Sequence, residues 1–282
     1  MKRTLFVVGA NSVVAQGVIP RLSQDNRVIT AGRRGCDAFC DITKEVIIPD
    51  GVDVVINFAA SFGGLDGLDV TEMARTNVLG MARICAATLR TGNVHIIAIS
   101  SIFASLDEHD PQFSMYALTK RQSDELAMAY CRHKGLPLTV LRLPRVYGDS
   151  DTFRKGQPFL YDILDKAQRG EDIALYGVRD TRRSYMHVTD VAEVLSRVVT
   201  GGVVGLYDCL CRSDDTYGSI TRTAQRVFGK GGDVTILLDK PSPPDDTVLY
   251  SPLLYEKLGY QPHITIEAGV ERVKRHRQGM AV

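Results

Sequence analysis

The stretch Leu5-Phe6-Val7-Val8-Gly9-Ala10-Asn11-Ser12-Val13-Val14-Ala15 decides the fold of this 282-residue chain. Its first four residues are all apolar, which indicates a strand that is covered on both faces. Gly9 permits a tight turn, and a helical pattern begins at Val13. A strand, a glycine turn and a helix form the first part of a βαβ unit, and the helix N-terminus offers free N–H groups to a phosphate.

Four further runs rich in valine and isoleucine predict strands over 28–31, 52–58, 94–100 and 138–143. Helical periodicity covers 13–24, 73–90 and 114–133, and returns at 159–168 and 188–199. This alternation predicts an α/β fold with a Rossmann-like, doubly wound parallel sheet. We expect a nucleotide-binding domain over 1–150. A smaller C-terminal α/β substrate lobe should cover 151–282, with segments that return to the first domain.

The composition points to an ordinary globular protein with a formal net charge of +1, which gives no indication of nucleic-acid or membrane-surface binding. No apolar run reaches the length of a transmembrane helix, and the short apolar run at the N-terminus does not resemble a signal peptide. We therefore expect a soluble, cytoplasmic protein. Six scattered cysteines form no CxxC or Cys/His pattern, so no metal site is expected.

The first turn and the end of the second predicted strand bear on cofactor binding. Ser12 and Ala15 stand where the dinucleotide fingerprint has glycines, so a plain strand–turn–helix connection is the alternative interpretation. An acidic residue after the second strand would accept the ribose 2′-OH of NAD, but this chain has Arg33 and Arg34 there. Two guanidinium groups suit a 2′-phosphate, so NADP(H) is predicted over NAD(H), with an ordinary basic loop as the alternative.

Three polar residues form a candidate catalytic centre: Ser101 at the end of a predicted strand, and Tyr116 and Lys120 on the helix that follows. Positions i and i+4 share a helix face, so Tyr116 and Lys120 should be neighbours. An ammonium beside a phenol should lower the tyrosine pKa and favour proton transfer near neutral pH. Ser101 can hold a reacting carbonyl near that tyrosine. By itself the YxxxK spacing also occurs by chance.

With these residues in place, the chain resembles the extended short-chain dehydrogenase/reductase family, which is rich in nucleotide-sugar enzymes. The resemblance spans most of the chain and includes Asn57-Phe58-Ala59-Ala60, Asn77-Val78-Leu79-Gly80, the segment 141–148, the segment 183–192 and Leu258-Gly259-Tyr260-Gln261-Pro262. It implies dinucleotide contacts from the turn, the basic pair, Asp41 and Ile42, and from residues near the nicotinamide. The implied cofactor set is Gly9, Asn11, Ser12, Val13, Val14, Arg33, Arg34, Asp41, Ile42, Phe58, Ala59, Ala60, Asn77, Tyr116, Lys120, Leu143, Pro144 and Val146.

The resemblance also suggests substrate contacts from Ser101, from Arg183 at a diphosphate and from Arg145, which stands where related epimerases often have asparagine. His187 lies in a family motif in which the histidine is usually structural, so a packed histidine is expected. The family often forms homodimers through the helices expected near 73–90 and 114–133, and a homodimer is predicted here.

The residues after Ser101 narrow the reaction that the resemblance implies. Dehydratases of the family carry an Asp-Glu pair there, and dual epimerase-reductases carry a cysteine, whereas this chain has Ile102-Phe103. The resemblance therefore favours an NADPH-dependent reductase of a nucleoside-diphosphate 4-keto-6-deoxy sugar. A 4-epimerase with tightly bound NAD is the alternative within the family. A non-catalytic NADP(H)-binding sensor is the alternative of another class.

Overall fold

The computed structural model describes residues 2–62, 67–213 and 215–280. By contacts among Cα atoms, the chain divides into two compact units. Unit 1 comprises Met1–Leu143, Ala192–Cys209 and Ser251–Tyr260. Unit 2 comprises Pro144–Val191, Leu210–Tyr250 and Gln261–Val282. Each unit thus gathers segments that are distant in the sequence.

Unit 1 contains a seven-stranded parallel sheet with the order β10-β6-β5-β4-β1-β2-β3. Its strands are β1 (Thr4–Val8), β2 (Arg27–Gly32), β3 (Ala38–Phe39), β4 (Val54–Asn57), β5 (His95–Ser101), β6 (Leu138–Leu143) and β10 (Gly205–Asp208). The strand order reverses between β1 and β4, as in a doubly wound sheet. The predicted Rossmann-like α/β fold is confirmed, and all five strands predicted from apolar runs are present.

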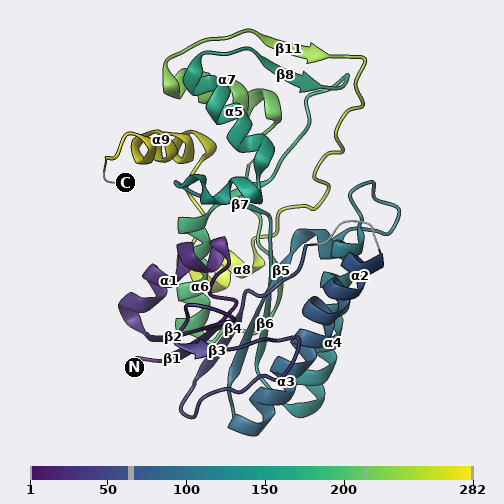
Figure 1. Ribbon diagram of the computed structural model, residues 1–282, viewed down its shortest axis with the longest axis vertical. Helices are drawn as coiled ribbons and strands as arrows, with labels where there is room; N and C mark the ends of the chain where they lie inside the picture. Colours follow the sequence, from purple (N-terminus) through teal and green to yellow (C-terminus); the bar gives the residue numbers. More distant parts are fainter. Residues whose placement is uncertain (1, 63–66, 214, 281–282) are drawn as a thin grey trace. The chain divides into compact units, whose positions relative to one another are not determined.

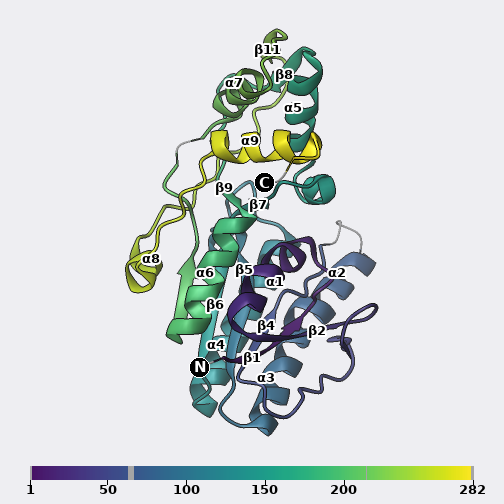
Figure 2. The same cartoon turned by 90° about the vertical axis from the view of Figure 1, so that its left-hand side faces the viewer.

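Helices cover both faces of this sheet (Figures 1 and 2). On one face lie α3 (Gly80–Thr91) and α4 (Met115–Lys134), whose apolar residues share a buried cluster with alternate residues of the strands, including Phe6 and Val55. On the other face lies α1 (Val13–Asp25), from which Arg21 donates to Glu193 of α6 (Val188–Gly201) at 2.9 Å. Of the helices in the described part of the chain, none combines the length and apolar character that a membrane span requires.

The segment predicted as one helix over 73–90 is divided in the structure. Helix α2 (Gly67–Met73) leads into a six-residue π-helical stretch, Ala74–Leu79, and α3 begins at Gly80. A Cβ at Gly80 would lie 2.6 Å from Cδ1 of Ile42, so this helix start packs directly on the loop after β3. Single π-turns often occur at functional sites, and this one carries Asn77.

Unit 2 is built from three helices and two small parallel sheets (Figure 1). The helices are α5 (Pro158–Arg169), α7 (Tyr217–Phe228) and α9 (Ile266–Arg277). The sheets pair β8 (Ile173–Tyr176) with β11 (Val234–Leu237), and β7 (Arg145–Tyr147) with β9 (Tyr185–His187). Three shorter helices complete the described elements: the 3₁₀ turns Ile102–Ser105 and Asp151–Lys155, and α8 (Leu253–Leu258).

An ion-pair cluster built on the buried side chain of His187 joins β9, α9 and the segment after β7 within unit 2. His187 is fully buried, and its Nε2 lies 3.0 Å from Oδ1 of Asp149 while its Nδ1 accepts from the backbone N–H of Thr189. Arg272 of α9 adds two hydrogen bonds to Asp149, at 2.9 and 2.8 Å. His187 is therefore a packed histidine with both ring nitrogens engaged. Desolvation opposes ionisation of Asp149, but its bonds to His187 and Arg272 outweigh it and lower the pKa of Asp149 to about 2.

This cluster makes the stability of the fold sensitive to acid. Asp149 stays ionised in the folded protein to about pH 2, but it protonates near pH 4 in the unfolded chain. Its contribution to the free energy of unfolding is therefore present above about pH 4 and lost as the pH falls toward 2. Asp149→Asn should lower the free energy of unfolding at pH 7 by about 1–3 kcal/mol, measured by urea denaturation. Asp25→Asn, in an exposed pair with Arg21, should change it by less than about 0.5 kcal/mol. Equal losses in the two variants would contradict the role given to the cluster.

Candidate active site

The turn after β1 has the close backbone approach that a dinucleotide cradle requires. Gly9 has φ +73°, and a Cβ there would lie 2.5 Å from the backbone nitrogen of Ala59. The N–H of Gly9 donates to the carbonyl of Ala31 at 2.9 Å, so the ends of β1, β2 and β4 meet at this residue. Ser12 caps α1, because its Oγ accepts from the N–H of Ala15 at 3.2 Å. The bare backbone at Gly9 and the capped helix start fit a pyrophosphate.

The end of β2 adjoins this turn through Asn11. A Cβ at Gly32 would lie 2.6 Å from Oδ1 of Asn11, and this oxygen also lies 3.4 Å from Sγ of Cys36. Arg33 and Arg34 follow Gly32 directly, and both are exposed. Two cationic side chains therefore stand beside the turn and are accessible to an anionic group.

Several of the other predicted dinucleotide contacts differ from one another in burial. Asp41 accepts from the N–H and the hydroxyl of Thr43, at 3.0 and 2.7 Å, and the bond from the hydroxyl is the main cause of its lowered pKa. The side chain of Ile42 is buried against Gly80, and its carbonyl accepts from Nη1 of Arg83 at 3.2 Å. Phe58 is also buried, whereas Ala59 and Ala60 are half-buried next to Gly9.

The three predicted catalytic residues come together in unit 1. Ser101 ends β5 and pairs in register with Leu143 at the end of β6. Its hydroxyl caps the following 3₁₀ turn and forms a hydrogen bond with the phenol of Tyr116 on α4. Lys120, one helical turn beyond Tyr116, is 5% exposed and donates to the carbonyl oxygen of Ile99 at 2.7 Å. A phenol, a hydroxyl and an ammonium are thus held on two adjacent elements.

The protonation of these groups departs from the prediction in one respect. Desolvation raises the pKa of Tyr116 well above its ordinary value, and the hydrogen bond from Ser101 only partly opposes this. The predicted lowering of the Tyr116 pKa is therefore wrong, because burial outweighs the effect of a nearby ammonium that is bonded to Ile99. Desolvation also lowers the pKa of Lys120 to about 8, against the opposing effect of Asp124.

Asn77 connects the π-helical turn to the catalytic helix. Its Oδ1 accepts from the N–H of Ser61 at 2.9 Å, and its Nδ2 donates to the carbonyl of Ser61 and to Oγ1 of Thr119. Thr119 lies between Tyr116 and Lys120, so Asn77 braces both the loop after β4 and the part of α4 that carries the catalytic pair. In this structure its amide stabilises the loop and the helix segment that carry the site.

Sequence reasoning missed an aromatic contact on the catalytic tyrosine. The ring of Phe62 stacks on the ring of Tyr116, with centroids 4.6 Å apart and an interplanar angle of 26°. Phe62 is nevertheless 75% exposed, an unusual state for so large an apolar side chain. No spacing rule connects residue 62 to residue 116, so only the folded chain reveals the contact.

The predicted residues after β6 take different roles. Leu143, Pro144 and Val146 are all buried, and they lie where the chain runs from the end of β6 into β7. Arg145 forms an ion pair with the buried carboxylate of Asp246. Asp246 also lies 3.8 Å from Nη1 of Arg183, so the two predicted substrate arginines share one buried carboxylate.

Arg183 retains hydrogen-bonding capacity. It is 4% exposed, and its Nη1 donates to the carbonyls of Arg182 and Pro244 at 2.9 and 2.6 Å. Its Nε is buried and finds no partner among the described residues. Its guanidinium carbon lies 4.4 Å from the ring centroid of Tyr217. A buried donor without a partner is costly, and an anionic ligand would satisfy it.

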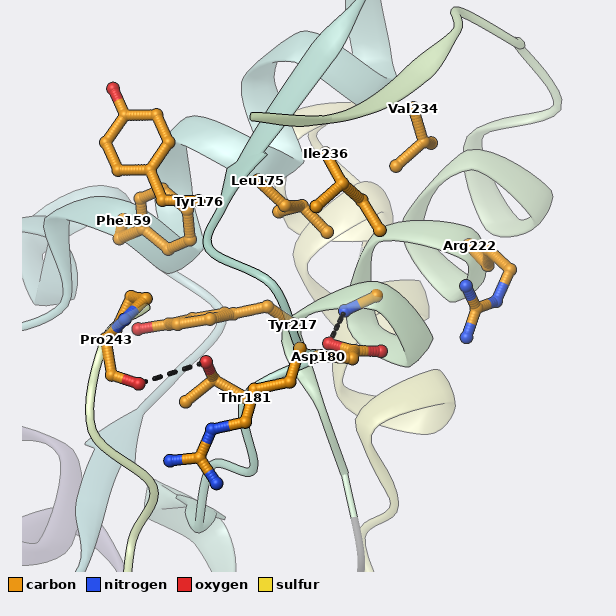
Figure 3. Close-up of a pocket in the computed structure, with 12 residues that line it drawn as sticks. Phe159, Leu175, Tyr176, Asp180, Thr181, Tyr217, Arg222, Val234, Ile236 and Pro243 are labelled. Carbon is orange, nitrogen blue, oxygen red and sulfur yellow. Dashed lines mark hydrogen bonds between the residues drawn. The ribbon is translucent and has the colours of Figure 1, made fainter. Parts of the chain in front are cut away.

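Tyr217 also lines a pocket of about 300 Å³ within unit 2 (Figure 3). The rings of Phe159 and Tyr217 form an edge-to-face pair with centroids 4.5 Å apart, and Tyr176 lies beside them. Asp180 accepts from the N–H of Gly218 at 2.8 Å and lines the pocket with Arg222. Aromatic walls with a few polar groups are typical of a site for a flat ring. These residues belong to no motif, so no sequence pattern predicted the pocket.

No metal centre accompanies these sites in the part of the chain that is described, since its histidine, cysteine and acidic side chains form no group of three that could hold an ion.

Comparison with known proteins identifies the relatives of this architecture. A model of the NAD dependent epimerase/dehydratase family matches residues 5–205. A trifunctional UDP-glucose 4,6-dehydratase/UDP-4-keto-6-deoxy-D-glucose 3,5-epimerase/UDP-4-keto-L-rhamnose-reductase of Arabidopsis thaliana is 25% identical over 260 residues. That match covers 85% of this chain but 38% of the plant protein, so the chain spans about two fifths of the length of that relative.

Two solved structures share the fold over nearly all of both chains. The UDP-glucose 4-epimerase of Thermotoga maritima, solved with UDP-glucose, has a TM-score of 0.78 at 19% identity and covers 98% of this chain and 99% of its own. The RMD protein of Pseudomonas aeruginosa, solved with NADPH, has a TM-score of 0.78 at 16% identity and covers 99% of both chains. At these identities the likeness establishes the fold alone.

The close approach at Gly9 yields a prediction with a matched control. Gly9→Ala must both adopt a left-handed backbone and collide with Ala59, whereas Gly35→Ala has φ +61° but open space around its Cβ. The left-handed conformation costs each variant about 1–2 kcal/mol. Only Gly9→Ala should also weaken dinucleotide binding, by about tenfold or more, because the shifted turn no longer fits the phosphates. Thermal unfolding and fluorescence titration with NADPH measure the two effects. Equal dinucleotide affinity in both variants would refute the cradle.

Proposed function

Because this chain belongs to the NAD dependent epimerase/dehydratase family, we propose that it is an NADPH-dependent ketoreductase acting on a nucleoside-diphosphate 4-keto-6-deoxy sugar. The family assignment rests on a match over more than half of the chain and places it among enzymes of the extended short-chain dehydrogenase/reductase type. The choice of reaction, cofactor and substrate rests on the site residues described above.

The observation that carries the proposal is the pairing of Ser101 with Tyr116, together with the absence of an acid or base from the two positions that follow Ser101 along the chain. Ile102 follows Ser101 and is buried, and Phe103 is the next residue. Neither side chain can remove a proton from a sugar carbon. Besides the hydride of the dinucleotide, reduction of a ketone needs one proton donor at the carbonyl oxygen, which this set provides.

The residues act on the carbonyl as follows in this proposal. Ser101 donates a hydrogen bond that holds the substrate oxygen against the phenol of Tyr116. Tyr116, whose raised pKa keeps it protonated at neutral pH, gives its proton to that oxygen as the C–O double bond becomes a single bond. Lys120 offers its remaining N–H groups to the nicotinamide ribose and supplies positive charge near the tyrosinate that forms.

The dinucleotide would be held by the bare turn at Gly9, the start of α1 and the end of β2. When bound, NADPH supplies the hydride that reduces the carbonyl carbon. Arg33 and Arg34 are exposed at the position that meets the adenosine ribose in this fold, which supports a 2′-phosphate over a 2′-hydroxyl.

The nucleotide part of the substrate would be bound by unit 2. Arg183 has a buried Nε that needs an acceptor, and a diphosphate oxygen suits it. The ring of Tyr217 lies against the Arg183 guanidinium and also lines the aromatic pocket, so the two features are adjacent. A diphosphate at Arg183 with its base beside Phe159 and Tyr217 accounts for both. The nucleotide-sugar substrates named for the relatives support the same assignment.

Replacing Tyr116 by Phe tests the proton donor. The variant should lose about 10²–10⁴-fold in turnover, because general acid catalysis is removed, while its affinity for NADPH stays close to that of the wild type. Tyr130→Phe, on the same helix, should keep full activity. The assay follows the fall in NADPH absorbance with 4-keto-6-deoxy sugars on different nucleotides. Unchanged turnover in Tyr116→Phe would sink the proposal, and interconversion of unoxidised sugars without NADPH consumption would favour the 4-epimerase. Dinucleotide binding with no turnover on any sugar would favour the sensor.

The cofactor preference is tested separately. Replacing both Arg33 and Arg34 by Ala should weaken NADPH use by about 10–100-fold, since two charge-assisted bonds to the 2′-phosphate are lost, and leave NADH use nearly unchanged. Arg27→Ala, at the opposite end of β2, is the control and should alter neither cofactor. Initial rates with each dinucleotide provide the measurement. A wild-type enzyme that consumes NADH far better than NADPH would overturn the preference without touching the reaction.

A further inference from the structure

A third functional group lies on the same face of α4 as the catalytic tyrosine and lysine. Tyr116, Lys120 and Asp124 are spaced four residues apart, so each lies one helical turn beyond the last. Asp124 is 2% exposed, which is rare for a carboxylate unless it is paired. The mechanism proposed above does not use it.

Asp124 is paired with an arginine from the strand beside the site. Nε of Arg142, on β6, lies 2.8 Å from Oδ2 of Asp124. Nη1 of the same guanidinium donates to Oγ of Ser105 at 2.9 Å, and Ser105 donates to Asp208 of β10 at 2.6 Å. The guanidinium of Arg142 is therefore bonded to both Asp124 and Ser105, and the bond to Asp124 fixes the position of that carboxylate.

This carboxylate is the charge that opposes the desolvation of Lys120. Burial alone favours the neutral amine, and Asp124 favours the ammonium. The charged and titratable groups around Lys120 are Tyr116 and Asp124 on α4, Arg142 on β6 and, through Ser105, Asp208 on β10. Among them, Tyr116 is held neutral, and Asp124 is the carboxylate whose charge acts on Lys120.

We propose that Asp124 is a positioning residue of the active site: its carboxylate, held by Arg142 one helical turn from Lys120, keeps the Lys120 side chain charged. This inference rests on the proposed function for its catalytic meaning, because Lys120 serves the dinucleotide and the tyrosine only as an ammonium. It also explains why the chain maintains a buried ion pair beneath a catalytic helix, since a buried pair by itself is weak support for stability.

Loss of the carboxylate has a consequence whose direction is determined by charge. Asp124→Asn removes the group that favours the ammonium and leaves Arg142 nearby, so the pKa of Lys120 must fall. An opposite charge at close range is worth about one to three pKa units. From a value of about 8, Lys120 would then lose its proton near or below pH 7. The contribution of the Lys120 ammonium to dinucleotide binding and catalysis would therefore be lost at a lower pH in Asp124→Asn than in the wild type.

The direct test is an NMR titration of the protein labelled with ¹³C at lysine Cε, with the Lys120 signal assigned by its loss in Lys120→Arg. We expect a midpoint near 8 in the wild type and one lower by about one unit or more in Asp124→Asn. Glu125→Gln removes an exposed acid at the next position of the helix and should leave the midpoint unchanged. Asp124→Glu keeps the charge and should restore most of the wild-type midpoint. An Asp124→Asn midpoint equal to that of the wild type would overturn the proposal.

A second variant covers the case in which Asp124→Asn does not fold. Replacing Asp124 and Arg142 together by leucine removes both charges, and such exchanges of a buried ion pair are often tolerated. The Lys120 midpoint should still lie below that of the wild type, because the carboxylate is gone. A midpoint at or above the wild-type value would count against Asp124.

Dinucleotide binding adds a functional readout that needs no sugar. The affinity for NADPH should decline above the Lys120 midpoint, so this decline should begin about one pH unit lower in Asp124→Asn than in the wild type. Its affinity at pH 6 should match the wild type. A wild-type protein that binds no dinucleotide at any pH would refute the proposed function, and the NMR titration would still decide the role of Asp124.

Discussion

The central constraint in unit 1 is the pairing of β1 with parallel strands on both sides. Val8 lies in register with Ala31 of β2 and with Asn57 of β4, so three chain segments leave the sheet at the same edge. They can leave it together only if the first has no side chain at the crossing, and Gly9 meets this need with its backbone against Ala59. The ends of β5 and β6 lie at the same edge of the sheet, with Ser101 and Leu143 in register, and Ser101 belongs to the catalytic residues. A residue larger than glycine at position 9 would disturb the strand ends on which the cofactor site depends.

The fold could be predicted because buried parallel strands are apolar at nearly every position, and this leaves a clear trace in sequence. The five runs of valine and isoleucine each became a strand. Other strands were not predicted for different reasons: β10 is the four-residue sequence Gly-Leu-Tyr-Asp and is not fully buried, whereas β8 and β11 are mostly apolar runs of only four residues that form a small sheet of their own. The helix expected over 73–90 contains a π-helical stretch over Ala74–Leu79, and Gly80 after it packs on Ile42, a contact between residues that no periodicity links.

The candidate site could be predicted where function follows a strand end or a helix turn, and not elsewhere. Ser101, Tyr116 and Lys120 follow that rule, and the structure brings them together. The state of the tyrosine could not be read from spacing, because its pKa is governed by how much protein surrounds the phenol. Phe62 on Tyr116, Arg142 on Asp124 and Tyr217 on Arg183 are likewise contacts between distant residues. Each of these contacts forms only in the folded chain, so no local sequence pattern predicts it.

The protonation of the two central groups bears on which reaction the site favours. A reduction begins with a neutral phenol that gives up a proton, whereas an epimerisation that starts from an alcohol begins with a tyrosinate that takes one. Each unit by which the Tyr116 pKa exceeds the ambient pH costs the tyrosinate about 1.4 kcal/mol. Burial of Tyr116 therefore penalises the tyrosinate in both directions, since an oxidation starts from it and a reduction ends with it, and only the starting protonation state of the phenol matches the reduction. The charged partner of the phenol is then needed most after the proton has left, when Lys120 can stabilise the new anion. This late need for positive charge gives a reason for the pKa of Lys120, which two opposing effects set at about 8: desolvation lowers it and the carboxylate of Asp124 raises it.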